Sequence, residues 1–184
     1  VDAAAKRQIA VNPHEPIKDT GLRRTYPNWV TREGARGMEF SAWGQPGNPP
    51  EHEANLAFTR LLAGPMDYTP GIFGMKTRAP DGVATTWAKQ LALYVTIYSP
   101  LQMVADLPEH YQDSTGKMHP AFAFIDAVPT DWQQSIALQG EIGEFLVVAR
   151  QDKHSERWFV GASNNQTARK VALPLNFLKA NTNY

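Results

Sequence analysis

The sequence predicts an α/β protein that joins the C-terminal part of a (β/α)8 barrel to the beginning of an antiparallel β-sandwich domain. Residues 1–130 alternate short apolar runs, polar loops and helix-like periodicity, whereas residues 131–184 contain short β-rich runs separated by turns. About three strand-helix units cannot close a barrel, which needs roughly eight strands. We therefore expect a domain boundary near Thr130 and an N-terminal remainder that supplies the other barrel strands.

The first residues predict the end of one helix and the start of a catalytic loop system. Residues 2–6 read as a last helical turn, and residues 8–11 as a short buried strand that opens into a polar loop. Barrel enzymes place catalytic groups in such loops. Residues 15–28 contain two prolines and a glycine and predict a long ordered loop, and residues 29–31 a second short strand.

The middle of the chain predicts helices separated by irregular segments. Gly and Pro forbid regular structure in residues 41–53. Apolar residues at helical spacing then predict a helix ended by Gly64 and Pro65; they are Leu56, Phe58, Leu61 and Leu62. A short strand and turn at residues 66–73 follow. Residues 85–107 predict one or two buried helices with a break at Pro100, and residues 122–128 a shorter helix.

The last part of the chain predicts an open antiparallel sheet. Its β-rich runs are residues 135–138, 145–150, 158–162 and 170–175. Four strands leave exposed edges, so we expect this module to continue beyond the last residue or to pair with another chain.

Composition limits the classes of function. Hydrophobic residues make up 42% of the 184 residues, which is enough to bury a core. Lys plus Arg equals Asp plus Glu at 18 each, so nucleic-acid binding has no obvious electrostatic source and a neutral or sugar-like substrate fits better. The absence of cysteine excludes disulfides, zinc-thiolate sites and cysteine nucleophiles. No apolar stretch is long enough to span a membrane. The missing initiator Met suggests part of a longer chain.

The residues with the most chemical potential lie between positions 11 and 40. This loop-rich stretch holds Glu15, Glu33 and Glu39 with His14. Carboxylates that converge either bind a hard cation through oxygen or divide acid and base roles at a glycosidic bond. The competing interpretation is that each Glu caps a helix or pairs with a nearby Arg. Three carboxylates in one glycine-rich loop system favour a site.

Other polar and aromatic residues allow two interpretations each. His14 could contact a substrate hydroxyl or be a structural residue. Asp67 could belong to the site, although a turn-capping role is the stronger expectation. Trp29 and Trp43 could stack on sugar faces or pack in the core. Phosphate loops, serine-nucleophile elbows and zinc-binding H-E-x-x-H motifs do not occur in the sequence.

Long motifs carry a family resemblance. They are HEPIKDTGLRRTYPNWVTREGARGMEF, NPPEHE, FTRLLAGPMDYTPGIF, TTWAKQLALYVTIYSPLQMVADLPEHY, GEIGEFLVVARQD and WFVGASNNQTAR. In these motifs the sequence resembles glycoside hydrolase family 97. The resemblance implies an N-terminal β-super-sandwich, a catalytic (β/α)8 barrel, a C-terminal β-sandwich and an active-site calcium ion. It places residues 1–130 in the barrel and residues 131–184 at the start of the C-terminal domain. It also implies a periplasmic or secreted bacterial protein.

The resemblance also assigns roles to individual residues. Glu39 is similar to the general acid and Glu15 to the general base, while His14 matches a substrate-contacting histidine. Glu33 is similar to a calcium ligand, and Glu15 and Glu39 complete the expected ligand set. Relatives that retain configuration have glycine at the position of Glu15 and use an Asp on an earlier strand as nucleophile. Glu15 thus places the chain in the inverting, α-glucosidase-like branch.

The expected activity is calcium-dependent hydrolysis of α-glucosides or malto-oligosaccharides from the non-reducing end, with inversion. Two alternatives remain open. The first is a retaining α-galactosidase-type relative, which a nucleophilic Asp in the missing strands would indicate. The second is a non-catalytic carbohydrate-binding or structural fragment, because most of the barrel lies outside the chain.

Overall fold

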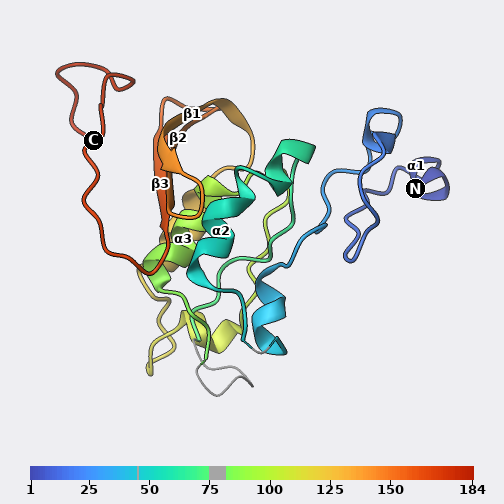
Figure 1. Ribbon diagram of the computed structural model, residues 1–184, viewed down its shortest axis with the longest axis horizontal. Coiled ribbons are helices and arrows are strands. Elements are labelled where there is room, and N and C mark those ends of the chain that lie inside the picture. The colour runs from blue at the N-terminus through green and yellow to red at the C-terminus, as the bar shows by residue number, and fades with distance from the viewer. Residues whose placement is uncertain (45, 75–81) are drawn as a thin grey trace.

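The computed structural model describes residues 1–44, 46–74 and 82–184 (Figure 1). Its α-helices are α1 (Asp2–Ala5), α2 (Pro50–Leu56), α3 (Trp87–Thr96) and α4 (Phe122–Ala127). Short 3-10 helices span Leu22–Arg24, Met38–Ala42, Arg60–Ala63 and Pro108–Tyr111. The strands are β1 (Trp132–Glu141), β2 (Phe145–Asp152) and β3 (Trp158–Asn164). The N-terminal segment and the C-terminal segment lie at opposite ends of the long axis, with α2, α3 and the sheet between them (Figure 1).

The three strands form one antiparallel sheet in the order β1-β2-β3. Two tight connections join them, and the first contains Gly143 at φ +80°, a conformation that favours glycine. Its backbone N–H donates to the side chain of Asn55 at 2.8 Å, which ties this hairpin to α2. Strand β2 lies in the middle and is buried along almost its whole length. The antiparallel sheet predicted for this part of the chain is therefore confirmed for three of its four strands.

Helix α3 packs against one face of this sheet. It begins with a side-chain cap, because Thr86 accepts a hydrogen bond from the backbone N–H of Lys89 at 3.1 Å. A Cβ on Gly161 of β3 would lie 2.7 Å from Val95, so the close approach requires glycine at this position. Arg150 of β2 donates from Nε to the Val95 carbonyl at 2.5 Å. The sheet and α3 are thus one packed unit.

Two hydrophobic clusters connect the helices to the preceding loops. The first contains Met38, Leu56, Met66, Tyr68, Leu93 and Ile97, and the second contains Phe73, Tyr94, Tyr111 and Ile125. Helix α3 contributes to both clusters through Leu93 and Tyr94. The first cluster reaches the 3-10 helix that carries Glu39. Packing against α3 therefore fixes the position of the glutamate-bearing loops.

Short segments before the sheet lie side by side and are joined through their backbones. Val11 and Trp29 form an isolated parallel bridge. The backbone N–H of Asp67 donates to the carbonyl of Arg32 at 2.9 Å, and that of Met66 donates to the carbonyl of Tyr98 at 3.0 Å. Neighbouring segments are thus joined in chain order by a few backbone hydrogen bonds. That order fits the edge of a barrel, and membership of a closed barrel remains a prediction.

Several predicted elements differ from the structure. The strands expected at residues 8–11 and 29–31 are reduced to the single bridge, because each segment meets its neighbour over one residue pair. Residues 66–73 form no ladder, and Thr69 and Gly71 within them have positive φ, so the expected short strand is not formed. Helix α2 begins at Pro50, a proline in the first turn, and ends at Leu56, so only its last residue belongs to the predicted apolar repeat. Beyond Ile97, residues of the predicted second helix are not helical.

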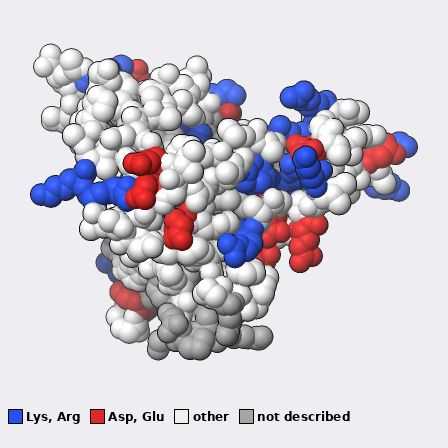
Figure 2. Space-filling model, in the orientation of Figure 1, with Lys and Arg blue, Asp and Glu red and all other residues white. Residues whose placement is uncertain are grey.

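The fourth strand predicted at residues 170–175 is wrong. These residues form no ladder, and Pro174 within them has no N–H to donate to a neighbouring strand. A second sheet, as a sandwich needs, is not formed by the residues that the structure describes. Within the same described ranges, no helix is long and apolar enough to cross a membrane. Acidic and basic side chains lie interspersed on the face drawn in Figure 2.

Candidate active site

Two loops bring His14, Glu33 and Glu39 together. One ligand atom from each of the three side chains lies within 4.8 Å of the other two. The backbone N–H of Glu33 donates to the carbonyl of Pro13 at 3.1 Å, which aligns the two loops. The backbone N–H of Met38 donates to the carbonyl of Tyr68 at 2.8 Å and so fixes the turn that carries Glu39. Two of the three predicted metal ligands and the predicted substrate histidine therefore converge.

His14 is held between two carboxylates. Its Nδ1 lies 3.2 Å from Oε1 of Glu39, and its Nε2 lies 2.9 Å from Oδ2 of Asp67. Partial burial by itself lowers the pKa of His14, but the hydrogen bonds with Asp67 and Glu39 outweigh it and raise the pKa above its ordinary value. The imidazole ring is therefore fixed in orientation between the two carboxylates.

Asp67 has a larger role than the sequence indicated. Its side chain is only 1% exposed, and its Oδ2 also accepts a hydrogen bond from the Asn12 side chain at 2.5 Å. Its Oδ1 accepts from the backbone N–H of Thr69 at 3.3 Å, so the expected turn-capping contact is present as well. Asp67 therefore both caps its own turn and orients a histidine of the site, as the two interpretations of the sequence proposed separately.

Glu15 lies beside Glu33 and contacts it through its backbone. Its N–H donates to Oε2 of Glu33 at 2.9 Å, and its carboxylate lies outside the set of converging ligand atoms. Glu15 has φ +49°, in the left-handed region that costs roughly 1–2 kcal/mol for a residue with a Cβ. Strain at a non-glycine residue often accompanies function. The roles of Glu15 as base and metal ligand stay predictions.

The three glutamates line one open cavity of about 280 Å³. Its walls are Glu15, Pro16, Glu33, Gly34, Ala35, Arg36, Glu39, Phe40 and Trp43. Trp43 is 61% exposed and stands at the wall of this cavity, as a sugar-stacking residue would. Trp29 instead lines a much smaller hollow beside Arg32. A larger cavity of about 530 Å³, at the start of α3, contains none of the predicted site residues.

Arg60 supports this site and was not predicted. Its guanidinium donates to the carbonyls of Arg32 and Glu33 at 3.0 and 2.9 Å and to two carbonyls of its own turn. Burial, followed by the nearby charge of Arg32, lowers the pKa of Arg60 to about 10. Gly34 has φ +65°, and a Cβ there would lie 2.9 Å from Nε of Arg60. Arg60 therefore holds the backbone on both sides of Glu33.

A buried charge network supports the turn of Glu39. Tyr68 donates its hydroxyl to Glu53 at 2.8 Å, and the Lys89 ammonium lies 2.6 Å from the other Glu53 oxygen. Burial, with the charge of Glu53 second, raises the pKa of Tyr68 well above its ordinary value. The Tyr68 carbonyl accepts the backbone hydrogen bond of Met38, next to Glu39. No sequence motif identifies this network, because its members are far apart in the chain.

The carboxylates fit part of a calcium site. Glu33 and Glu39 offer oxygen ligands at a mutual separation that two ligands of one cation can have, since each would lie about 2.3–2.6 Å from Ca²⁺. The nitrogen of His14 is a poor calcium ligand and is already engaged by Glu39 and Asp67. Calcium takes six to eight oxygens in total. These residues would therefore supply only a minority of the ligands.

Two models of known families match the chain. The model described as "Glycosyl-hydrolase 97 C-terminal, oligomerisation" matches residues 131–184, and the model described as "Glycoside hydrolase 97" matches residues 1–35. The first range contains all three strands of the sheet, and the second contains His14, Glu15 and Glu33.

Solved structures and a curated protein match nearly the whole chain. A glycoside hydrolase family 97 enzyme from a Pseudoalteromonas species, in complex with panose, is 54% identical over 98% of this chain and 28% of its own, with a TM-score of 0.88. The same kind of enzyme in complex with acarbose is 55% identical over the same shares, also with a TM-score of 0.88.

A retaining α-galactosidase from Bacteroides thetaiotaomicron is 33% identical over 96% of this chain. The chain spans about a quarter of that protein, since the match covers 27% of its length. Family models match both ends of the chain, and the structural match covers the sheet, the helices and the glutamate-bearing loops in between. The chain belongs to glycoside hydrolase family 97.

Proposed function

We propose that this chain is part of a glycoside hydrolase that cleaves α-glucosidic bonds of malto-oligosaccharides or related α-glucosides from the non-reducing end. The observation that carries the proposal is the convergence of Glu33, Glu39 and His14 beside an open cavity whose wall includes Glu15. Hydrolysis of a glycoside needs two carboxyl groups with different roles, and this cavity holds three. Membership of the family supports glycosidase activity.

The α-glucoside preference has support in the relatives. The structural relative that is 54% identical was solved with panose, a trisaccharide of α-linked glucose. The curated α-galactosidase is a more distant relative at 33% identity. A sugar that enters the cavity would meet the exposed indole of Trp43 at its wall, where a ring face can stack.

Glu39 suits the role of general acid because it lines the cavity and His14 holds its side chain in place. The ring of His14 lies between Asp67 on its Nε2 side and Glu39 on its Nδ1 side, so the histidine is within hydrogen-bond reach of the Glu39 carboxyl group. When the ring is protonated, the same Nδ1 donates to the Glu39 carboxylate. A general acid needs to lie next to the glycosidic oxygen, and Glu39 is the member of this pair that lines the cavity.

Glu15 would act as the base that removes a proton from the attacking water, which gives inversion of configuration. Calcium, when bound by Glu33 and Glu39 with further oxygen ligands, would stabilise developing charge as a Lewis acid. Glu33 also accepts the backbone N–H of Glu15 at 2.9 Å and so holds this loop against the cavity wall.

A retaining α-galactosidase is the second candidate, favoured by the name of the curated relative. Rates for aryl α-glucosides and aryl α-galactosides with the complete protein separate the two. We expect kcat/KM for the glucoside to exceed that for the galactoside by at least about tenfold. A preference for the galactoside would contradict the proposal, and no turnover of either would favour a non-catalytic carbohydrate-binding or structural role.

A further inference from the structure

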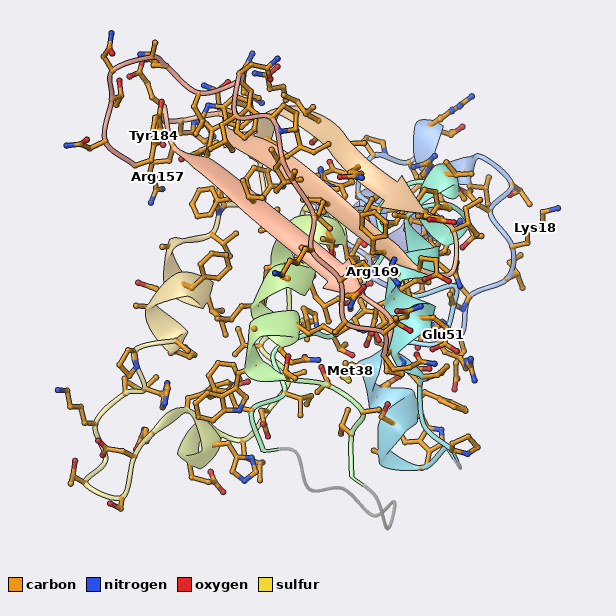
Figure 3. The ribbon with its side chains drawn as sticks, turned by 60° about the vertical axis from the view of Figure 1, so that its left-hand side comes forward. Lys18, Met38, Glu51, Arg157, Arg169 and Tyr184 are labelled. Atoms are coloured by element: carbon orange, nitrogen blue, oxygen red, sulfur yellow. The ribbon has the colours of Figure 1, made fainter. Side chains whose placement is uncertain are left out.

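A second cavity lies on the sheet, far along the chain from the glutamates. Its volume is about 390 Å³, and its walls are Gln134, Gln151, Glu156, Arg157, Trp158, Phe177, Lys179, Thr182 and Tyr184. It shares no residue with the cavity that contains Glu39. Figure 3 shows Arg157 and Tyr184 next to each other at the end of the strands, where the C-terminal segment folds over the sheet.

A row of side chains across the three strands forms the floor of this cavity. Gln134 of β1 pairs with Gln151 of β2, which pairs with Trp158 of β3. Directly paired residues in an antiparallel sheet point to the same face. The Gln134 amide donates to the Gln151 carbonyl oxygen at 3.1 Å, which leaves one half of each amide for another partner. The register of the strands therefore determines which side chains form the floor and where the two amide groups lie.

Aromatic residues of the C-terminal segment complete the cavity. The ring centroids of Trp158 and Phe177 lie 4.8 Å apart, and Tyr184 accepts a hydrogen bond from the backbone N–H of Lys179 at 2.9 Å. Tyr184 is 67% exposed. The cavity thus presents aromatic surface from two parts of the chain that are not adjacent in sequence.

The charged residues of the cavity are already paired. Arg157 lies 3.2 Å from the buried carboxylate of Asp152, and Lys179 is bonded to Glu156. What the cavity offers to a ligand is therefore aromatic faces, amide groups and the hydroxyl of Thr182. Within the part of the chain that the structure describes, the Trp158 indole N–H makes no hydrogen bond to protein. This chemistry suits an uncharged, hydroxyl-rich ligand with an apolar ring face.

We propose that this cavity is a second carbohydrate-binding site, for a neutral oligosaccharide, on the C-terminal sheet. One sugar ring packs on the aromatic surface of Trp158 and Tyr184, and its hydroxyls bond to Gln134, Gln151 and Thr182. The choice of an α-glucan as ligand rests on the proposed function, whereas the site itself does not. Such a site would hold a long substrate near the enzyme while its end is hydrolysed elsewhere.

The test is a calorimetric titration of the complete protein with maltoheptaose, with Glu39→Gln as the background so that the sugar is not consumed. Trp158→Ala should weaken binding by about tenfold or more, a size expected for the loss of one stacked ring. Tyr184→Ala removes an exposed ring without touching the core and should weaken binding in the same direction. Glu109→Ala, at an exposed position that lines neither cavity, should leave this binding unchanged.

Unchanged binding in Trp158→Ala and Tyr184→Ala overturns the proposal, whatever the enzyme hydrolyses. Binding of the α-galactoside raffinose in place of maltoheptaose, still sensitive to both variants, supports the site and contradicts the choice of sugar. Light scattering gives the mass of each variant. If both variants lower the mass and no sugar binds, the cavity is a contact between copies of the chain and the proposal is wrong.

Discussion

Nδ1 of His14 lies 3.2 Å from Oε1 of Glu39, and Nε2 of the same ring lies 2.9 Å from Asp67. The side chain of Asp67 is 1% exposed, whereas that of Glu39 is 41% exposed. The side chain of His14 therefore links a buried carboxylate to a carboxyl group that lines the cavity. A general acid has to lie within hydrogen-bond reach of the substrate, and the exposure of Glu39 supports the acid role proposed for it.

Glu39→Gln should lower the rate on substrates with poor leaving groups by roughly 10²–10⁴-fold, as expected for the loss of general-acid catalysis. Aryl glycosides of very acidic phenols need little protonation and should be hydrolysed at nearly the original rate. The measurement is kcat/KM for both substrate types with the complete protein. Equal losses on both types would show that Glu39 has another role.

Calcium should stabilise the protein through Glu33 and Glu39. Treatment with a chelator should abolish activity and lower the melting temperature, and added calcium should restore both, because an ion that binds only the folded state shifts unfolding by mass action. Glu33→Ala should remove the response. Glu109→Ala, at an exposed position on another part of the chain, should keep it. A melting temperature that changes with neither chelator nor calcium would exclude calcium binding at this site.

Because the backbone of Glu15 is left-handed, the protein with glycine at this position should be more stable than the protein with alanine. Because φ is +49°, Glu15→Gly removes the steric cost of a Cβ and should be about 1 kcal/mol more stable than Glu15→Ala, while both lose the carboxylate. At Glu109, where no positive φ occurs, the order should reverse. Denaturant unfolding of the four variants measures this, and the same order at both positions would contradict it.

Asp106 should make the fold sensitive to acid. Its carboxylate accepts backbone hydrogen bonds from Phe73 and Gly74, both at 2.6 Å, and contacts His110 at 2.6 Å. Burial by itself raises the pKa of Asp106, but the N–H of Gly74 and His110 outweigh it, so the pKa lies below its ordinary value. A lowered pKa contributes stability above about pH 4 that is lost as the pH falls through the folded value.

Asp106→Asn should therefore lower the free energy of unfolding by about 1–3 kcal/mol at pH 7, since hydrogen bonds to the carboxylate are lost or weakened. It should also flatten the fall in stability between pH 5 and pH 2, an interval of about three units around the ordinary Asp value. Asp126→Asn, on the exposed side of α4, is the matched control. An unchanged slope in Asp106→Asn would disprove the assignment.

Local sequence signals predicted much of the sheet and of α3. Strand β2 has the apolar and β-branched composition of a buried strand, and α3 has a capping threonine before a helical repeat. The strand expected near Pro174 does not form. The prediction followed the β-like composition around Pro174 and gave too little weight to the N–H that proline lacks. In each case the outcome depended on residues within one element.

The site was predictable only where its residues are close in sequence. His14, Glu33 and Glu39 lie in one polar stretch, and their types indicated a cation or acid-base site before any contact was known. Asp67 is 53 residues from His14, and Arg60 reaches the Glu33 carbonyl across 27 residues. Their roles follow from tertiary packing, and the spacing of residues in the sequence does not predict such long-range contacts.

The last prediction concerns the stereochemistry of hydrolysis and depends on Glu15. A base that activates water needs that water between itself and the anomeric carbon, so the carboxyl groups of Glu15 and Glu39 should stand about 6.5–9.5 Å apart in the complex with substrate, whereas a nucleophile and an acid would be nearer 5 Å. Glu15 is absent from the tight set formed by His14, Glu33 and Glu39, which agrees with the wider spacing.

Hydrolysis of an α-glucoside by the complete protein should therefore release β-glucose first. Proton NMR of the anomeric signals in the first minutes, before mutarotation, shows which anomer forms. Glu15→Gly should lose most of this activity, because no group remains to take the proton of the water, and added azide should restore turnover by replacing the water as nucleophile. If the native protein releases α-glucose first, a covalent intermediate forms on a carboxylate elsewhere in the protein, and Glu15 is not the base.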